Sequence, residues 1–279
     1  MLETAKQSDL PLASQRRLEI LSQLQEAGAV RVASLATRFG VADETIRRDL
    51  DKLSDQGQLA RTHGGAISIR HDRVDLPMAI RKNRRAAEKQ QIANQALELI
   101  NPNDVIGLDA STTVLELACL IPDMPLTVVT NSLDVIRLLA DRPQIEVICS
   151  GGEFDPKSMC LFGPLAEANI QQIALSKLFF SCKGIDFEHG YSEASTHHAS
   201  LKRVFLQQAE QSILLADSSK FGVRSMVSSG KLDLVDLVIT DESTGSDYLE
   251  SLQKRHVQTE VASPRSSAQT DPKMTETMQ

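Results

Sequence analysis

The turn that follows one apolar run in this 279-residue sequence combines groups that could hold a phosphate. In GLDASTTVLELA, residues 107–118, Asp109 ends the run, and Ser111, Thr112 and Thr113 open a helical pattern. Backbone N–H groups and the helix dipole at such a position favour a bound anion. Ser111 could equally serve as the N-cap of that helix, so the turn alone leaves both interpretations open.

Further polar turns follow later apolar runs. They are TNS at 130–132, SGGEFD at 150–155, KGID at 183–186 and ADSSKFG at 216–222. In an open parallel sheet the carboxyl ends of the strands meet at one edge, where ligands bind. A lysine there can neutralise a phosphate, and an aspartate can bind sugar hydroxyl groups. Lys202, within a helical stretch, could add a charge or could lie on a solvated helix face.

The N-terminal quarter presents a different charged surface, in VADETIRRDLDKLSDQGQLARTHGGA, residues 41–66. An amphipathic helix here would turn outward Glu44, Thr45, Arg47 and Arg48. In a major groove, arginine can bond bidentately to guanine, and threonine can contact a thymine methyl group or a phosphate. Arg61 and His63, on the following hairpin, would reach the DNA backbone or the minor groove. The alternative is that the two helix arginines form ordinary ion pairs with the neighbouring Asp49 and Asp51.

Three helical patterns and a hairpin position these residues. The first helix is expected at 14–27 with Ser14 as its N-cap, the second at 32–39, and the third starts with Asp43 as its N-cap. Gly64 and Gly65 turn the hairpin that follows. Helix, helix, helix and hairpin is the order of a winged helix-turn-helix domain, which we assign to residues 14–70.

The rest of the chain predicts a larger domain. Residues 71–88 are charged and interrupted by Pro77, which predicts a linker. From 89 to 261, short apolar strands alternate with helices, which predicts an α/β domain with a largely parallel sheet. The polar segment 262–279 is expected to be a disordered tail.

Charge is divided unevenly between these segments. Residues 14–85 hold 14 Lys and Arg against 9 Asp and Glu, although the whole chain has a formal net charge of -7. This asymmetry favours a polyanion as the partner of the N-terminal part. No apolar run has the length of a signal peptide core or a membrane span, so we expect a cytoplasmic protein without a membrane partner.

The four cysteines show no spacing typical of a metal site. They are scattered without a CxxC pair, and His197 and His198 have no cysteine nearby in the sequence. Zinc sites usually show closely paired ligands. We therefore expect small buried cysteines in a reducing compartment, with no metal and no cofactor.

The segment TIRRDLDKLSDQGQLARTHGGA resembles the DNA-binding signature of the DeoR family of bacterial transcriptional regulators. The likeness runs without a gap from Arg16 to Ala66. By this resemblance Thr45, Arg47 and Arg48 lie on the recognition helix, and residues 63–66 form the tip of the wing. The elements DASTT, TNS, SGG, GID and ADSSKFG also resemble the effector domain of the family, whose fold is similar to that of sugar-phosphate isomerases and CoA transferases.

The resemblance implies a set of effector-binding residues. They are Asp109, Ala110, Ser111, Thr112, Thr113, Asn131, Gly151, Gly152, Lys183, Asp186, Lys202 and Lys220. The sequence departs from the family pattern at 181–183, which is Ser-Cys-Lys rather than a Gly-Val-Asp-type run, and in HHASLKR, which lacks the acidic residue often found before the lysine. FSCKGID and LDAS are similar to the corresponding runs of family members that regulate fucose operons, which points to a deoxysugar phosphate.

We therefore expect a DNA-binding transcriptional regulator of a sugar-catabolic operon, either repressor or activator. It would bind double-stranded operator DNA as a homo-oligomer and respond to a phosphorylated sugar. Two alternatives stay open. A sugar-phosphate isomerase-like enzyme with an accessory DNA-binding segment would use Asp109, Asp186 and His189 for proton transfer. A structural DNA-binding protein would have no small-molecule effector.

Overall fold

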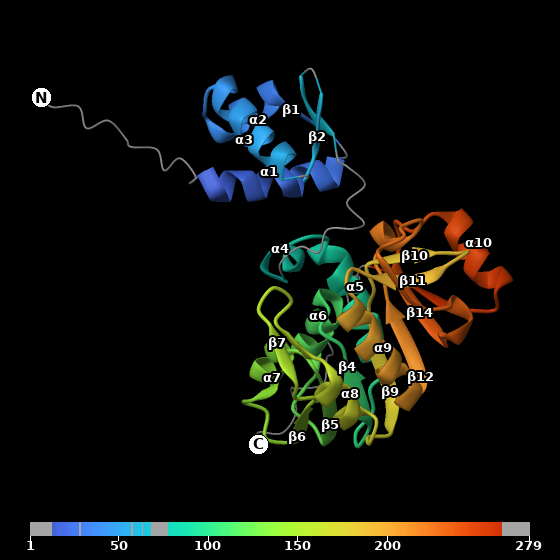
Figure 1. The fold of residues 1–279 in the computed structure, drawn as a ribbon. Helices are drawn as coiled ribbons and strands as arrows, with labels where there is room; N and C mark the ends of the chain where they lie inside the picture. Colours follow the sequence, from blue (N-terminus) through green and yellow to red (C-terminus); the bar gives the residue numbers. More distant parts are fainter. Residues whose placement is uncertain (1–12, 28, 57, 63, 68–77, 264–279) are drawn as a thin grey trace, which may run out of the picture. The chain divides into compact units, whose positions relative to one another are not determined.

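The computed structural model describes residues 13–27, 29–56, 58–62, 64–67 and 78–263 (Figure 1). The chain divides into two compact units, Met1–Val74 and Asp75–Gln279. Within the described ranges, none of the helices has the length and apolar character needed to cross a bilayer.

Three helices and a small sheet form the first unit, which confirms the predicted helix-turn-helix domain. The helices are α1 (Ala13–Ala27), α2 (Val32–Phe39) and α3 (Asp43–Asp55). The strands are β1 (Ala29–Arg31), β2 (Ala60–Thr62) and β3 (Gly65–Ile67). Buried Ile20, Leu35 and Ile46 belong to one apolar cluster, so a single core joins the three helices. Gly40 ends α2 in the left-handed conformation, with φ of 63°, which glycine adopts without strain.

Two local features of this unit differ from the sequence-based expectation. The sequence does not predict β1, which pairs with β3 and gives the wing three strands in the order β1-β3-β2. A strand of three residues shows too little alternation to be recognised in a sequence. The N-cap of α3 is Ala42, which makes no side-chain capping bond, so the expectation that Asp43 is the cap was wrong. Asp43 instead lies in the first turn, where the helix dipole favours its negative charge.

A seven-stranded parallel sheet forms the centre of the second unit, in the order β15-β14-β12-β9-β4-β5-β6. Its strands are β4 (Val105–Leu108), β5 (Leu126–Thr130), β6 (Ile145–Cys149), β9 (Leu175–Phe180), β12 (Ala209–Leu215), β14 (Leu237–Asp241) and β15 (Gln258–Ala262). The chain builds outward from β4 to β6, then returns to β9 on the other side of β4 and builds outward again. The direction therefore reverses between β4 and β9, which is where open parallel sheets bind ligands.

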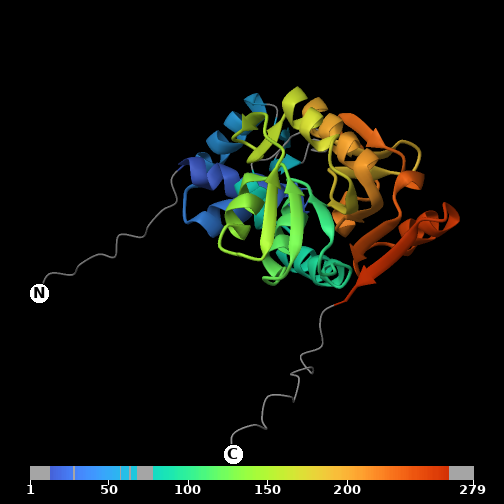
Figure 2. The same cartoon turned by 90° about the horizontal axis from the view of Figure 1, so that it is seen from below.

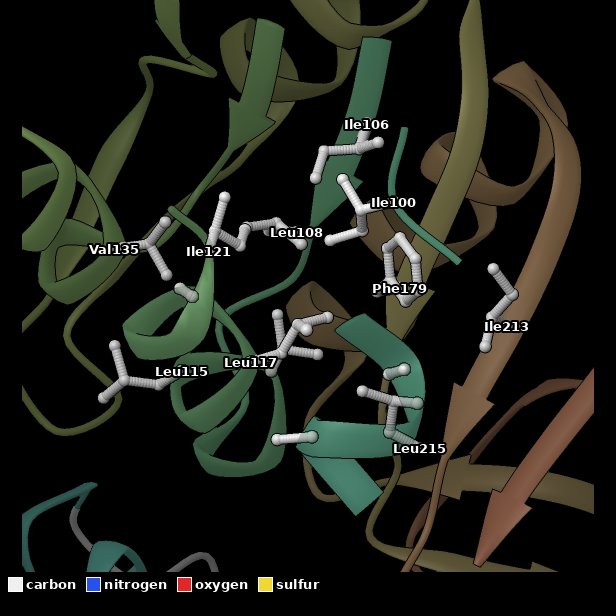
Figure 3. Packing of buried hydrophobic residues seen from close by; sticks show 14 of the residues in the cluster. Ile100, Ile106, Leu108, Leu115, Leu117, Ile121, Val135, Phe179, Ile213 and Leu215 are labelled. Atoms are coloured by element: carbon white, nitrogen blue, oxygen red, sulfur yellow. The ribbon is translucent and has the colours of Figure 1, made fainter. Parts of the chain in front are cut away.

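Helices cover both faces of this sheet (Figures 1 and 2). One face carries α5 (Ala86–Leu97), α6 (Thr112–Leu120) and α7 (Leu133–Leu139), and the other carries α8 (Pro164–Ile170), α9 (Thr196–Gln208) and α10 (Ser246–Lys254). Because successive side chains of a strand point to opposite faces, Phe179 lies in the first core and Phe180 in the second. Figure 3 shows the first core, where Phe179 lies among aliphatic side chains of strands and helices.

Smaller elements extend the second unit. Strands β7 (Glu153–Asp155) and β8 (Cys160–Phe162) form a hairpin after β6. Strands β10 (Gly184–Asp186), β11 (Gly190–Glu193) and β13 (Val227–Gly230) form a separate antiparallel sheet. The short helix α4 (Met78–Lys82) precedes α5.

The predicted linker and tail lie only partly within the described residues. Buried Met78 belongs to the first core, so residues 78–88, predicted as linker, are part of the larger unit. Residues 68–77 lie outside the described residues. Ala262, the first residue of the predicted tail, is buried in β15, and residues 264–279 lie outside the description.

Candidate DNA-binding surface and ligand site

Helix α3 turns a charged face away from the core of the first unit. Ile46, Leu50 and Leu53 are buried, whereas the predicted DNA-contacting residues Glu44, Arg47 and Arg48 are exposed and Thr45 is half-buried. Arg48 Nε lies 3.6 Å from Glu44 Oε1, one helical turn away. A long ion pair between exposed side chains is weak and separates easily, so Arg48 is available to an anionic partner.

The neighbouring aspartates are occupied elsewhere. Asp49 is buried and binds two arginines of α1, Arg16 Nε at 2.6 Å and Arg17 Nη1 at 3.3 Å. Asp51 binds Arg61 Nε at 2.8 Å. The alternative that Arg47 and Arg48 form ion pairs with Asp49 and Asp51 is therefore wrong, because both aspartates bind other arginines. The exposed helix ion pair that Arg48 does form is with Glu44. The Arg16–Asp49 pair instead fixes α1 against α3.

Arg61, on strand β2 of the wing, binds other residues of the first unit. Besides Asp51, Arg61 donates through Nη1 to the carbonyl oxygen of Gly65 at 2.6 Å, so its guanidinium group binds within this unit. A Cβ atom on Gly65 would lie 1.8 Å from the carbonyl oxygen of Val30, so only glycine allows β1 to approach β3 so closely. Gly64 is exposed, and His63 lies outside the described residues.

In the second unit, Asp109 stands where the strand order reverses. It follows β4, and its backbone N–H donates to the carbonyl oxygen of Phe179 in β9 at 3.3 Å. Its carboxylate accepts the backbone N–H groups of Ser111 and Ser181, each at 3.1 Å. Asp109 thereby joins the turn after β4 to the turn after β9.

Lys202, from α9, completes this junction. Its Nζ donates to Asp109 and to the carbonyl oxygen of Ser181, and lies 3.0 Å from Glu193 Oε1. The lysine is only 7% exposed, so the alternative of a solvated helix face was wrong. Burial favours a lower pKa for Lys202, but attraction to Asp109 and Glu193 outweighs it and raises the pKa. Glu193, which binds Lys202 from β11, is not among the effector-binding residues that the resemblance implies.

Helices α6 and α7 both begin at the carboxyl ends of the strands. Ser111 is the N-cap of α6 and accepts the N–H of Val114 at 3.2 Å, which confirms the capping interpretation. Ser132 caps α7 in the same way, accepting from Val135 at 3.3 Å. A capping bond uses one of the four N–H groups that a helix start leaves unpaired, so it does not exclude a bound anion. Half-buried Ala110 and buried Thr112 and Thr113 flank the cap.

Asn131, directly after β5, has an unpaired oxygen. Its Nδ2 donates to the carbonyl oxygen of Leu161 at 3.0 Å, while its buried Oδ1 has no hydrogen-bond partner among the described residues. A buried oxygen without a donor is costly, so this atom suits a ligand hydroxyl group. Gly151 and Gly152 follow β6 with φ of 66° and 102°, and a Cβ on Gly152 would lie 2.3 Å from the carbonyl oxygen of Phe162.

Two further lysines, Lys89 of α5 and Lys220 after β12, act electrostatically on one another. Lys220 ends the 3-10 helix η2 (Ser218–Lys220), which follows β12, and its charge acts on Asp217 and on Lys89. Lys89, from α5, is only 4% exposed and donates to the carbonyl oxygen of Arg81. In the described part of the chain Lys89 forms no ion pair, and burial lowers its pKa to about 8. Sequence reasoning missed Lys89, because AAEKQQ is typical of an exposed helix face.

The remaining predicted residues lie in the β10–β11 hairpin. Asp186 Oδ1 binds His189 Nδ1 at 2.8 Å and accepts two backbone N–H groups, and these bonds lower the pKa of Asp186. Lys183 is half-buried, and its N–H donates to the carbonyl oxygen of Ser192 at 2.9 Å. The Asp186–His189 pair therefore forms the hairpin turn, whereas the Asp109 carboxylate binds Ser111, Ser181 and Lys202. The three groups of the isomerase alternative are not joined into one proton-transfer array by these bonds.

Comparison with protein families assigns both units. Residues 16–72 match the DeoR-like helix-turn-helix domain, and residues 84–242 match the DeoR C terminal sensor domain. The chain belongs to the DeoR family. The helix-turn-helix match lies in the first unit and the sensor-domain match lies in the second.

Relatives of this DeoR-family chain are transcriptional regulators. The chain is 38% identical over 237 residues to the L-fucose operon activator of Haemophilus influenzae, covering 85% of this chain and 95% of that protein. It is 37% identical over 246 residues to the uncharacterized HTH-type transcriptional regulator YulB of Bacillus subtilis, and this match covers 88% of this chain and 95% of that protein. It is 30% identical over 249 residues to the glycerol-3-phosphate regulon repressor of Escherichia coli, covering 89% and 98%.

A solved ribose 5-phosphate isomerase A from Methanocaldococcus jannaschii also aligns with 49% of this chain and 55% of that chain, at 12% identity and a TM-score of 0.37.

Proposed function

We propose that this regulator controls a sugar-catabolic operon and changes its affinity for double-stranded operator DNA when a phosphorylated sugar binds to its second unit. The observation that supports the proposal is buried Lys89, which forms no ion pair with the described residues and has Lys220 among the charged groups around it. Two lysines near one another, one of them buried, suit a ligand with more than one negative charge.

Charge balance decides which lysines take the phosphate. Lys202 is already matched by two carboxylates, Asp109 and Glu193. Around Lys89, the cations Lys89, Lys220 and Arg81 face the anions Asp217 and Glu116, which leaves an excess of one positive charge. The phosphate is therefore proposed to bind Lys89, Lys220 and the free N–H groups at the start of α6. Lys202 then acts as a positioning residue for Asp109 and Ser181.

The sugar ring is proposed to lie toward β5 and β6. Asn131 Oδ1 offers an acceptor for a hydroxyl group, and Gly151 and Gly152 allow close approach of the backbone. Because two relatives are named for fucose and glycerol-3-phosphate operons, the tested compounds include fuculose 1-phosphate and glycerol 3-phosphate. The fucose-related resemblance favours a deoxysugar phosphate.

Operator binding is proposed to use the exposed face of α3 in the major groove, with the wing beside it. Paired operator half-sites call for a homo-oligomer. If the effector binds one arrangement of the protein better than another, operator affinity shifts by the same coupling free energy, typically about 1–3 kcal/mol.

The proposal is tested by measuring affinity for the DNA upstream of the chain's own gene, with and without each sugar phosphate, at one fixed salt concentration. We expect one compound to shift the affinity about 5- to 150-fold. Lys220→Ala should keep the affinity measured without effector and lose the shift. Lys254→Ala is the matched control, because Lys254 is an exposed lysine of α10 that forms an exposed ion pair with Glu250.

Three outcomes are decisive. Tight operator binding that no compound changes would remove the effector and leave a structural DNA-binding protein. A normal response in Lys220→Ala would contradict the phosphate position. Turnover of an aldose or ketose phosphate by the wild type, lost in Asp186→Ala, would support the enzyme alternative instead.

A further inference from the structure

We propose that Asp155, Cys160 and His198 form a binding site for a divalent transition metal, with Zn²⁺ as the best match. The two residues of the β7–β8 hairpin and the one residue of α9 each offer a ligand atom, and these three atoms all lie within 4.8 Å of one another. The proposal is independent of the sugar-phosphate effector.

The three groups were not expected to meet. His198 has no cysteine nearby in the sequence, and this separation was the reason for expecting no metal. The fold brings Cys160 Sγ to 3.4 Å from His198 Nε2, across 38 residues of chain. The expectation considered neighbours in the sequence and not neighbours in space.

The distances suit a small tetrahedral ion. Zinc bonds of about 2.0–2.3 Å to nitrogen, oxygen and sulfur place neighbouring ligand atoms about 3.3–3.6 Å apart. Cys160 Sγ and His198 Nε2 are 3.4 Å apart, and His198 Nε2 and Asp155 Oδ2 are 4.0 Å apart. Sub-ångström movements of these side chains would bring three ligands to one ion and leave a fourth position for water.

The chemistry of the donor set selects the class of metal. A thiolate, an imidazole and a carboxylate together favour a borderline ion such as Zn²⁺, whereas Mg²⁺ and Ca²⁺ prefer oxygen ligands throughout. Cys160 is fully buried, while the side chains of His198 and Asp155 are 18% and 28% exposed. The site therefore has a protected sulfur and a route by which an ion can enter from solvent.

The surrounding structure holds the three residues in place. Asp155 and Cys160 are directly paired across the β7–β8 hairpin. Ser195 caps α9 by accepting the backbone N–H of His198 at 3.2 Å, which fixes the start of that helix. Ligands on a paired hairpin and a capped helix need little reordering when a metal binds.

Ser158 is the group that a bound metal would displace. Its hydroxyl binds the Asp155 carboxylate and lies 3.0 Å from Cys160 Sγ and 3.2 Å from His198 Nε2. A change of one side-chain rotamer moves a serine hydroxyl out of such a position. Ser158 could then keep its bond to the carboxylate, as outer partners of metal ligands do.

A metal here would tie two parts of the second unit together. Two backbone hydrogen bonds also join the hairpin to the turn after β5. The N–H of Leu161 donates to the carbonyl oxygen of Asn131, and the N–H of Leu133 donates to the carbonyl oxygen of Met159. In α9, Lys202 follows His198 by one turn on the same helix face. Metal binding would therefore clamp the hairpin near Asn131 to the helix that carries Lys202.

Cobalt titration of the full-length, chelator-treated chain tests the proposal. Co²⁺ replaces Zn²⁺ in such sites, and a bound thiolate gives a charge-transfer absorption band that reports the sulfur directly. We expect one equivalent of Co²⁺ to produce this band and one equivalent of Zn²⁺ to remove it. Cys160→Ala should lack the band, and Asp155→Ala and His198→Ala should bind Co²⁺ far more weakly.

Matched controls separate this site from loose metal binding. His197→Ala removes the exposed neighbouring histidine, and Cys149→Ala removes an exposed thiol, and both should keep the wild-type band. Ser158→Ala should keep the band while changing the affinity by about 10–100-fold, because it alters an outer partner. If Cys160→Ala does not fold, His198→Gln gives the same test from the helix side.

Three results would overturn the proposal. They are the absence of a thiolate band in the wild-type chain, a band of wild-type affinity in His198→Ala and His198→Gln, and loss of the band in Cys149→Ala. Each would mean that Asp155, Ser158, Cys160 and His198 form a hydrogen-bonded cluster only.

Discussion

Both units contain a buried ion pair between a helix and another element, but the two pairs do different things. In the first unit, Asp49 binds Arg16 and Arg17, and all three residues lie on two helices that pack together. In the second unit, Lys202 binds Asp109 and Glu193 at the open edge of the sheet. The first pair fixes a helix whose other face carries exposed arginines, whereas the second lies among the residues proposed to bind a ligand.

The sizes of the two proposed partners, operator DNA and a sugar phosphate, would explain the difference. DNA is a large polyanion, so the residues that bind it remain exposed and the buried pair only orients their helix. A small ligand must be surrounded, so its binding groups are buried and need internal partners when the ligand is absent. The comparison can be tested by removing charges from each region in turn.

The largest effect is expected from Lys202→Ala. It would leave Asp109 and Glu193 buried without their cation, which should lower the free energy of unfolding of the second unit by about 3–5 kcal/mol. Urea unfolding of the full chain measures this, with Lys254→Ala as the exposed control. A loss below about 1 kcal/mol would mean that water reaches the two carboxylates and that the pair is not buried in solution.

Asp49→Ala is expected to have the next largest effect. Arg16 would lose its buried partner, while Arg17, a quarter exposed, can still reach water, so we expect a loss of about 3 kcal/mol. The unfolding midpoint of the first unit and operator affinity should both fall. Unchanged operator affinity in a destabilised variant would show that the pair holds the core but does not orient α3.

Lys89→Met should stabilise the chain by about 2 kcal/mol at pH 7, because it removes a buried cation that forms no ion pair with the described residues. The pKa of Lys89 is lowered from 10.5 to about 8 in the folded chain. Between these values the unfolded chain binds more protons, so wild-type stability should gain from this group as pH rises from about 8 toward 10.5. Comparing the pH dependence of unfolding in the wild type and in Lys89→Met isolates that gain.

The groups that act on Lys89 are Asp217, Lys220, Glu116 and Arg81. If wild type and Lys89→Met show parallel stability curves over this pH range, Lys89 is not buried as described. A sugar phosphate that binds beside Lys89 should raise its pKa, so the effector should shift the wild-type curve and leave the Lys89→Met curve in place.

The smallest change in stability is expected from Arg48→Ala. Its exposed pair with Glu44 is worth less than about 0.5 kcal/mol, so unfolding should hardly change. Operator binding should weaken by about 1–3 kcal/mol if Arg48 contacts a base. Equal weakening on operator and unrelated DNA would instead identify a phosphate contact.

Local patterns explain what the sequence could predict. The spacing of Ile46, Leu50 and Leu53 specifies which face of α3 is buried, and the apolar runs specify the parallel strands. The polar turns after those runs predict which residues lie at the carboxyl ends of the strands. Each of these inferences depends on residues within about one or two turns of a helix or one strand.

Contacts between distant segments could not be predicted in this way. Lys89 is buried because α5 packs on the sheet near Lys220, and nothing in AAEKQQ indicates that neighbour. Cys160 and His198 meet only because the hairpin after β6 lies against the start of α9. Likewise, the capping role of Ser111 could be predicted from the residues next to it in the sequence. The bond from the N–H of Ser181 to Asp109 could not, because it depends on β9 lying beside β4.

The alternation within β9 also limits how the length of the chain can vary. Phe179 and Phe180 occupy cores on opposite faces of the sheet, and β9 is paired on both sides, by β4 and β12. Insertion or deletion of a single residue within this strand would exchange the two rings between the cores and shift Ser181 relative to Asp109. Insertions and deletions should therefore be tolerated in the turns at the amino ends of the strands, such as 171–174, and rejected within β9.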